Sequence, residues 1–227
     1  MNPSRFGSSG FSPLELNPEV WLDVNDSSTV TKDGSDYISQ LDDKSGNGNN
    51  YTQPTGSLQP LWSATMQNGL SGFICNNDWM GLDTFASGTL SRPITICAVI
   101  KMPTQASDFA WESNSATSRN LFMNNATTSY YVGSTPYLIG GTMDSANTLV
   151  YVTNVTTTSG YLRRSKSELM SGASGSQTMI GSNLGVSNNR GDGLGDMRFC
   201  EFILINSTLS TEQLDSVETY LTDKWIP

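Results

Sequence analysis

Short apolar segments, each the length of a β-strand, recur along this chain of 227 residues and are bounded by Gly, Asn, Ser, Thr or Pro. The segment 195–206 is the most informative of these and predicts one long buried strand. Other strands are predicted at 18–24, 37–42, 59–62, 71–75 and 93–101, in a hairpin of 148–155 with 160–164, and more weakly near 107–111, 119–124, 129–132 and 137–139. Many short strands with turns between them predict an all-β, two-sheet antiparallel jelly-roll sandwich.

The hydrophobic period changes after residue 206. Leu214, Val217, Leu221 and Trp225 recur at the spacing of one helical face. Ser210 is a favourable N-cap, and Gln213 three residues later completes a capping box. We therefore predict a single amphipathic helix at the end of the chain, directly after the long strand.

The polar surface is built mainly from Asn, Ser, Thr and Gly, because charged residues make up only 15% of the chain. An average domain has about 25%. The net charge of -9 makes nucleic acid an unfavourable partner. The length fits one domain, for which we predict residues 14–227, preceded by an N-terminal arm at 1–13. Phe6 and Phe11 of this arm lie about 16 Å apart if it is extended, and are predicted to anchor it in another subunit.

The chain contains no histidine, which excludes Ser-His-Asp and Cys-His catalysis as well as zinc sites with histidine ligands. The three cysteines are far apart, and each lies within an apolar, strand-like segment. They are Cys75, Cys97 and Cys200. Buried free thiols are the favoured interpretation, with one disulfide and a spare thiol as the alternative.

Three segments carry a resemblance to a known family. They are Val20–Asp23 with the acidic, Gly/Asn-rich stretch 38–49; the strand 91–99; and 179–225, which includes the final strand and helix. Together they resemble the concanavalin A-like lectin/glucanase superfamily in its laminin G-like form. Leu41 stands where that family more usually has an aromatic residue. The resemblance implies a jelly roll, but this fold serves lectins, hydrolases, adhesion modules and structural parts alike.

Catalysis is not expected from the carboxylates. A retaining glycosidase needs two carboxyl groups about 5 Å apart. Asp196 and Glu201 share the last predicted strand, but a spacing of five residues predicts opposite faces. We therefore expect a protein that is not an enzyme.

Two groups of residues are candidates for binding. Trp79, Trp111, Tyr130 and Tyr131 offer rings for stacking on sugars, with burial in the core as the alternative. Asp42, Asp43, Asn47 and Asn49 offer oxygen ligands to calcium, which many laminin G-like domains bind. The favoured alternative for this loop is an Asx-rich turn that bonds its own backbone, because it lacks several converging carboxylates and contains Lys44. No other cofactor is expected.

The resemblance also implies a biological setting, because single-domain chains of this kind are frequent among virion proteins of tailed phages. We predict a capsid or tail decoration protein that binds other virion subunits through its arm. Its lectin-like fold would offer a surface for glycans of the host or the environment. The alternatives are a receptor-binding lectin of a tail fibre and a carbohydrate-active enzyme. We expect synthesis in the host cytoplasm without a signal peptide, a place on the virion surface, and no membrane insertion, since the longest apolar run, 94–100, is strand-sized.

Overall fold

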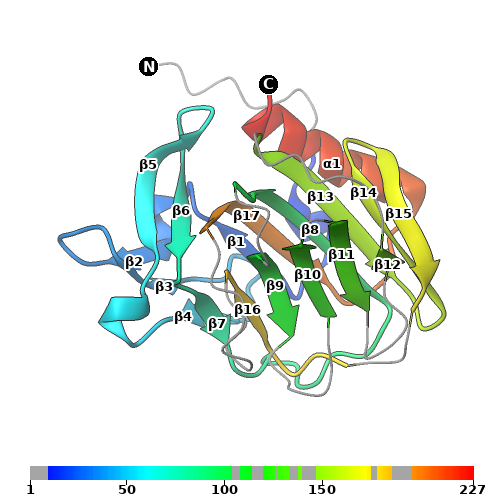
Figure 1. Ribbon diagram of the computed structural model, residues 1–227, viewed down its shortest axis with the longest axis horizontal. Coiled ribbons are helices and arrows are strands. Elements are labelled where there is room, and N and C mark those ends of the chain that lie inside the picture. The colour runs from blue at the N-terminus through cyan, green and yellow to red at the C-terminus, as the bar shows by residue number, and fades with distance from the viewer. Residues whose placement is uncertain are drawn as a thin grey trace.

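The computed structural model describes residues 10–103, 108–113, 120–125, 127–132, 138–139, 147–174, 178–185 and 196–227. Two antiparallel β-sheets pack face to face, and one C-terminal helix lies against the outer face of one of them (Figure 1). The predicted all-β sandwich with a single C-terminal helix is confirmed.

The sheet that carries the helix, called here the helix-side sheet, has the strand order β15-β14-β13-β8-β17-β6-β5, and β1 also pairs with β17. Its strands are β1 (Val20–Asp23), β5 (Leu61–Gln67), β6 (Leu70–Asn76), β8 (Ile94–Lys101), β13 (Leu149–Val155), β14 (Ser159–Arg164), β15 (Ser167–Ala173) and β17 (Asp196–Ile205).

The opposite sheet has the order β12-β11-β10-β9-β16-β7-β4-β3-β2. Its strands are β2 (Val30–Lys32), β3 (Ile38–Leu41), β4 (Tyr51–Thr52), β7 (Met80–Leu82), β9 (Asp108–Ser113), β10 (Asn120–Asn125), β11 (Thr127–Val132), β12 (Leu138–Ile139) and β16 (Ser182–Leu184). Three short 3-10 helices lie in the described connections, namely η1 (Pro13–Leu16), η2 (Ser27–Thr29) and η3 (Gly56–Leu58).

The central strand β8 is buried on both faces, which explains its unbroken apolar run. Ile96, Ala98 and Ile100 point into the core between the two sheets. Cys97 and Val99, on the other face, belong to a second core beneath the helix. The helix-side sheet is therefore the middle layer of three over this part of the molecule.

Helix α1 (Thr211–Trp225) forms as its sequence predicts. Ser210 and Gln213 make both bonds of the capping box. The four residues of the predicted face, Leu214, Val217, Leu221 and Trp225, are between 0% and 1% exposed. All three cysteines are free and buried, which confirms the favoured interpretation. No helix in the described part of the chain is long and apolar enough to cross a membrane.

A β-bulge in β17 overturns the prediction that Asp196 and Glu201 lie on opposite faces of their strand. The register of β17 against β8 shifts between Phe199 and Glu201. Met197 and Phe199 point into the core between the sheets, so Asp196 points to the helix side. Because the bulge adds one residue, Glu201 points to the helix side too, where it contacts α1. The two carboxylates therefore lie on one face, but about 15 Å apart along the strand.

The start of the described chain folds against the domain. Ser12 caps η1, whose Pro13 and Leu16 are buried. The half-buried ring of Phe11 packs on Tyr220 of α1, with their centroids 5.9 Å apart. One predicted anchor of the arm is thus in contact with the chain's own helix, whereas Phe6 lies outside the described residues.

Candidate functional site

Helix α1 covers only part of the helix-side sheet. The residues beneath it come mainly from β8, β13 and the later half of β17. Strands β5 and β6 lie on the other side of β17, and Figure 1 shows them at the left, away from most of α1. At the hairpin end of these strands, Met66 and Leu70 pack against the core beneath the helix, whereas the end with Leu61 and Ile74 lies beyond it.

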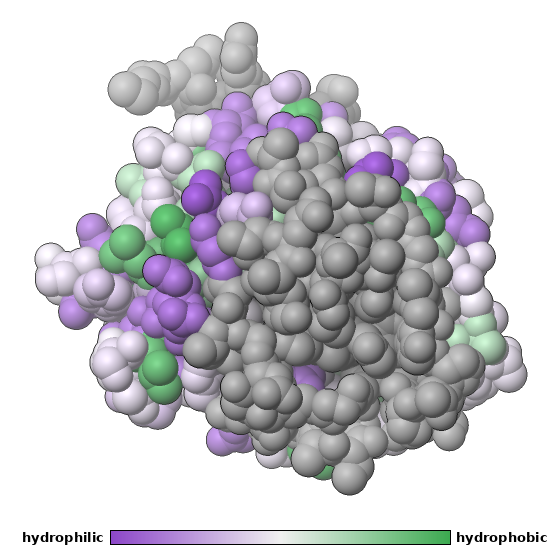
Figure 2. Space-filling model, in the orientation of Figure 1, coloured by the Kyte–Doolittle hydropathy of each residue, from purple (hydrophilic) through white to green (hydrophobic). Residues whose placement is uncertain are grey.

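A groove of about 530 Å³ lies at the end with Leu61 and Ile74. It is lined by Tyr37, Gly56, Ser57, Leu61, Ile74, Asn76 and Asp78. Its floor is an apolar pair, because Leu61 of β5 lies directly opposite Ile74 of β6. Ile74 points outward since its neighbours Phe73 and Cys75 belong to the core. Figure 2 shows hydrophobic and strongly hydrophilic residues side by side on the part of the surface around these strands.

Tyr37 supplies an exposed aromatic ring to the groove. The residue is 41% exposed, and Leu61 beside it is 37% exposed. Its backbone is held by a tight turn: the Tyr37 N–H donates to the Asp33 carboxylate at 2.9 Å, and its carbonyl accepts from the Asp33 N–H at 3.0 Å. A backbone bridge to Leu61 joins this turn to β5. The ring is therefore presented from a fixed backbone rather than from a free loop.

The polar side of the groove comes from the connection between β6 and β7. The Asp78 carboxylate accepts a hydrogen bond from the Asn76 N–H at 3.1 Å. Burial raises the pKa of Asp78 above its ordinary value. An amide, a carboxylate and an apolar floor therefore face one groove.

The wall formed by η3 is tied to the same connection. The Gln53 amide donates to the Trp79 carbonyl at 3.2 Å, and the Gln59 amide donates to the Gln53 carbonyl at 2.8 Å. The Trp79 N–H donates to the Leu58 carbonyl. These bonds hold η3 and the 76–79 segment together, so both sides of the groove are attached to one framework.

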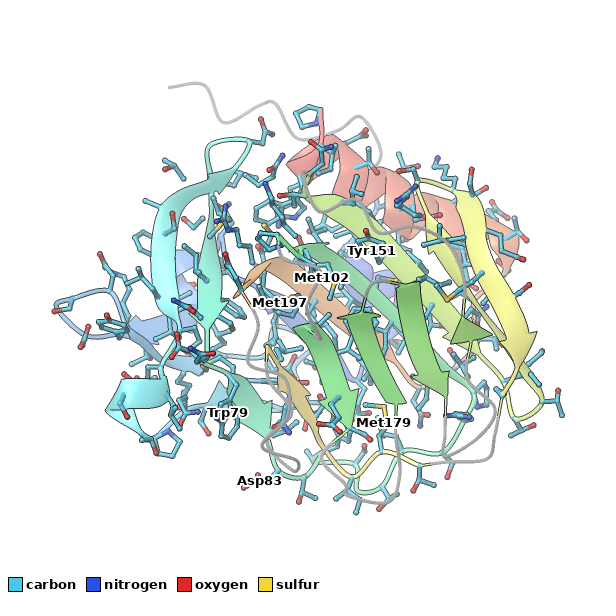
Figure 3. The ribbon with its side chains drawn as sticks, in the orientation of Figure 1. Trp79, Asp83, Met102, Tyr151, Met179 and Met197 are labelled. Atoms are coloured by element: carbon cyan, nitrogen blue, oxygen red, sulfur yellow. The ribbon has the colours of Figure 1, made fainter. Side chains whose placement is uncertain are left out.

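The four predicted aromatic candidates have different outcomes. Trp79 is half-buried beside β7 (Figure 3), and its ring lies so close to Gly81 that a Cβ there would be 2.5 Å from it. It follows Asp78 in sequence and supports the groove without lining it. Trp111 is only 1% exposed and packs near Phe202, so the prediction that it can stack on a sugar is wrong. Tyr130 and Tyr131 lie on β11, but their side chains fall outside the description.

The proposed calcium loop uses its side chains to bond nearby backbone. The Asp43 carboxylate accepts from the N–H groups of Trp21, Ser45 and Asn49. The amides of Asn47 and Asn49 donate to the Glu19 carbonyl at 3.2 and 2.7 Å. Asp42 accepts from the side chain of Gln40. Within the described residues, no three Cys, Asp or Glu side chains are grouped as a metal site.

Glu201 lies beneath the helix, away from the groove. Its carboxylate accepts from the indole N–H groups of Trp21 and Trp225, at 2.8 and 2.7 Å, from the Tyr220 hydroxyl at 3.0 Å and from Lys224 at 2.7 Å. Lys224 also pairs with Asp23 at 2.8 Å. This network joins β1, β17 and α1, which makes Glu201 a structural residue.

The sequence did not identify the groove residues, because they come from four separate segments. Tyr37 carried one local signal, as an aromatic residue directly after the polar turn segment 33–36. The apolar floor carried none, since Leu61 and Ile74 are ordinary strand residues until their cross-strand pairing is known.

No protein-family model matches the chain, and no curated protein does. Solved structures share the fold. The binding domain of Paraclostridial Mosquitocidal Protein 1 is similar with a TM-score of 0.66 and 14% identity, over 90% of this chain and 52% of that one. The binding domain of botulinum neurotoxin serotype G gives a TM-score of 0.65 and 10% identity, over 90% and 51%.

A third structure matches over nearly its whole length. Domain 4 of AbnA, a GH43 extracellular arabinanase from Geobacillus stearothermophilus, was solved in complex with arabinotriose. It has a TM-score of 0.60 and 13% identity, over 88% of this chain and 98% of that one. The chain thus spans about half of the two toxin binding domains but nearly all of this arabinanase domain. At these identities the similarity establishes the fold alone.

Proposed function

We propose that the protein is a glycan-binding domain and that the groove beside Tyr37 holds the sugar. The observation that carries the proposal is the exposed Tyr37 ring beside the apolar pair of Leu61 and Ile74, within one groove that also contains Asn76 and Asp78. The fold supports it, because one structural neighbour is an arabinanase domain solved with arabinotriose.

The chemistry of the groove fits a sugar. Sugar rings have apolar C–H faces, which pack on aromatic rings and aliphatic side chains. Their hydroxyl groups need hydrogen-bond partners when they leave water, and Asn76 and Asp78 supply an amide and a carboxylate. Because the groove is open along the sheet face, it also accepts an internal segment of an extended polysaccharide and does not require the end of the sugar chain.

We expect no hydrolase activity. The arrangement that supports this expectation is the separation of Asp196 from Glu201, together with the four hydrogen bonds that occupy the Glu201 carboxylate. Incubation with a panel of polysaccharides should release no reducing ends. Turnover that is abolished by Asp78→Asn, the carboxylate change in the groove, would overturn this expectation.

We also propose that the domain serves on a virion surface, as a decoration protein of a capsid or tail. This proposal rests on the sequence resemblance alone. Mass spectrometry of purified particles tests it directly. Detection of the chain at a stoichiometric copy number supports a structural role, and its absence from particles while present in the lysate refutes it.

The glycan-binding proposal is tested by combining a glycan array with one substitution. Tyr37→Ala removes the exposed ring and should weaken binding of the selected glycan at least tenfold. Ile180→Ala is the matched control, since Ile180 is similarly exposed at 40% but does not line the groove. Equal binding by the wild type and Tyr37→Ala would refute the site. Failure of the wild type to bind any glycan would refute the function.

A further inference from the structure

Two cations lie in line with the groove. Lys101 of β8 is directly opposite Arg198 of β17. Arg198 is in turn opposite Ile74, and Ile74 is opposite Leu61. These four residues form one row across four neighbouring strands, about 14 Å long at three inter-strand spacings. The apolar floor of the groove therefore continues into a pair of positive charges.

All four side chains of this row project from the same face of the sheet. Ile100, the residue before Lys101, points into the core between the sheets, and so does Phe199, the residue after Arg198. Lys101 and Arg198 therefore point to the helix side, which is the side that carries the groove. Helix α1 ends just beside them, because Ile226 lines the same pocket as both cations.

That pocket has a volume of about 270 Å³. It is lined by Met66, Gln67, Lys101, Asn147, Thr148, Leu149, Arg198 and Ile226. Gln67, Asn147 and Thr148 add amide and hydroxyl groups to the two cations. The tip of the β5–β6 hairpin, which provides Met66 and Gln67, lies at the same end of the molecule as the C-terminus (Figure 1).

Within the described part of the chain, the charges in this pocket are weakly compensated. Like charges directly opposite each other in a sheet are destabilising. The only ion pair of Arg198 among the described residues is to Asp196, at 3.9 Å, and its buried Nε has no hydrogen-bond partner there. Lys101 forms no ion pair within the same part of the chain.

Three other cations of the described residues are paired more closely with carboxylates. Arg163 lies 2.6 Å from Asp215, Lys44 lies 2.7 Å from Asp26, and Lys224 lies 2.7 Å from Glu201. In a chain with 21 acidic and 12 basic residues, carboxylates are abundant. Among the described residues, the two facing cations have one acidic partner, Asp196, which lies 3.9 Å from Arg198, so an external anion would compensate their charge further.

We propose that Lys101 and Arg198 bind an acidic group of the glycan, such as a carboxylate, sulfate or phosphate, so that the groove selects acidic polysaccharides. The proposal rests on the proposed glycan binding. The sugar ring packs at Tyr37 and the apolar floor, and its charged substituent, or that of the next sugar, meets the guanidinium and ammonium groups. Asp196 offsets part of this positive charge.

The direct test uses inorganic sulfate as the probe. Backbone amide resonances of the ¹⁵N-labelled protein are followed during titration against chloride at constant ionic strength. Saturable shifts at residues 101 and 198 are expected in the wild type. Arg198→Gln and Lys101→Gln should each weaken sulfate binding at least fivefold, whereas Lys32→Gln, at an exposed lysine beside Asp36, should leave it unchanged. Shifts that are absent, or equal in all variants, would overturn the proposal.

A second arm separates this proposal from the glycan site itself. Polygalacturonate and its methyl-esterified, neutral form are added to the glycan array. Binding that depends on Tyr37 but is insensitive to both Arg198→Gln and ligand charge would leave the groove intact and refute the acidic selectivity. Sulfate binding that survives Tyr37→Ala, without any glycan binding, would refute the glycan function and leave an anion site alone.

Discussion

The attachment of helix α1 provides a quantitative prediction. The Trp225 side chain is 0% exposed, and its indole N–H donates to the Glu201 carboxylate at 2.7 Å. Trp225→Phe keeps most of the apolar volume but removes this donor. A hydrogen bond to a charged group contributes about 1.5–3 kcal/mol, and Glu201 keeps its three other donors. We therefore expect a loss of about 2 kcal/mol, or about 4–8 °C in Tm for a domain of this size.

Trp225→Ala should cost about 3–5 kcal/mol, because it also leaves a cavity. This is a large part of the total stability of about 5–15 kcal/mol that is typical of a domain. Thermal and urea unfolding followed by circular dichroism measures both changes. Asp223→Asn, at an exposed position of the same helix turn, is the control and should stay within about 0.5 kcal/mol. Equal stabilities of Trp225→Ala and the wild type would refute the buried position of the helix.

Two further predictions concern ionisation. The hydrogen bond from Lys44 lowers the pKa of Asp26 to about 2, so this ion pair stabilises the fold above the ordinary pKa of 3.8 and stops doing so as the pH falls towards 2. Asp26→Asn should therefore lower the Tm at pH 6 but not at pH 2. An equal loss of Tm at both pH values would contradict the ion pair. Burial raises the pKa of all three thiols, so Cys75, Cys97 and Cys200 should react with a thiol reagent only after unfolding; rapid reaction of the native protein would contradict their burial.

The parts of the fold that sequence predicts best are those with an uninterrupted pattern. Strand β17 is mostly apolar, and α1 has a capping box and a regular hydrophobic face, so the existence of both follows from local sequence. Strand β15 was not predicted, because it lies at the edge of its sheet and most of its residues are exposed and polar. Strand β16 was not predicted either, because its three buried residues include Ser182 and Asn183.

The candidate site was less accessible to sequence reasoning, for two physical reasons. A strand residue's role depends on its cross-strand neighbours, so the row from Leu61 to Lys101 appears only when the register is known. Local polarity also misled: Trp111 is followed by Glu112 and Ser113, yet all three are buried in the middle of the opposite sheet. The bulge in β17 similarly changed the face of Glu201, which strict alternation could not show.

The most direct test of the central claim is a map of the residues that contact the glycan selected by the array. Backbone amide shifts of the labelled protein, with and without that glycan, provide the map. The largest changes are expected around the groove, at residues 37, 56–57, 61, 74, 76 and 78. Changes confined to the opposite sheet or to the surface of α1, with the groove residues unaffected, would contradict it.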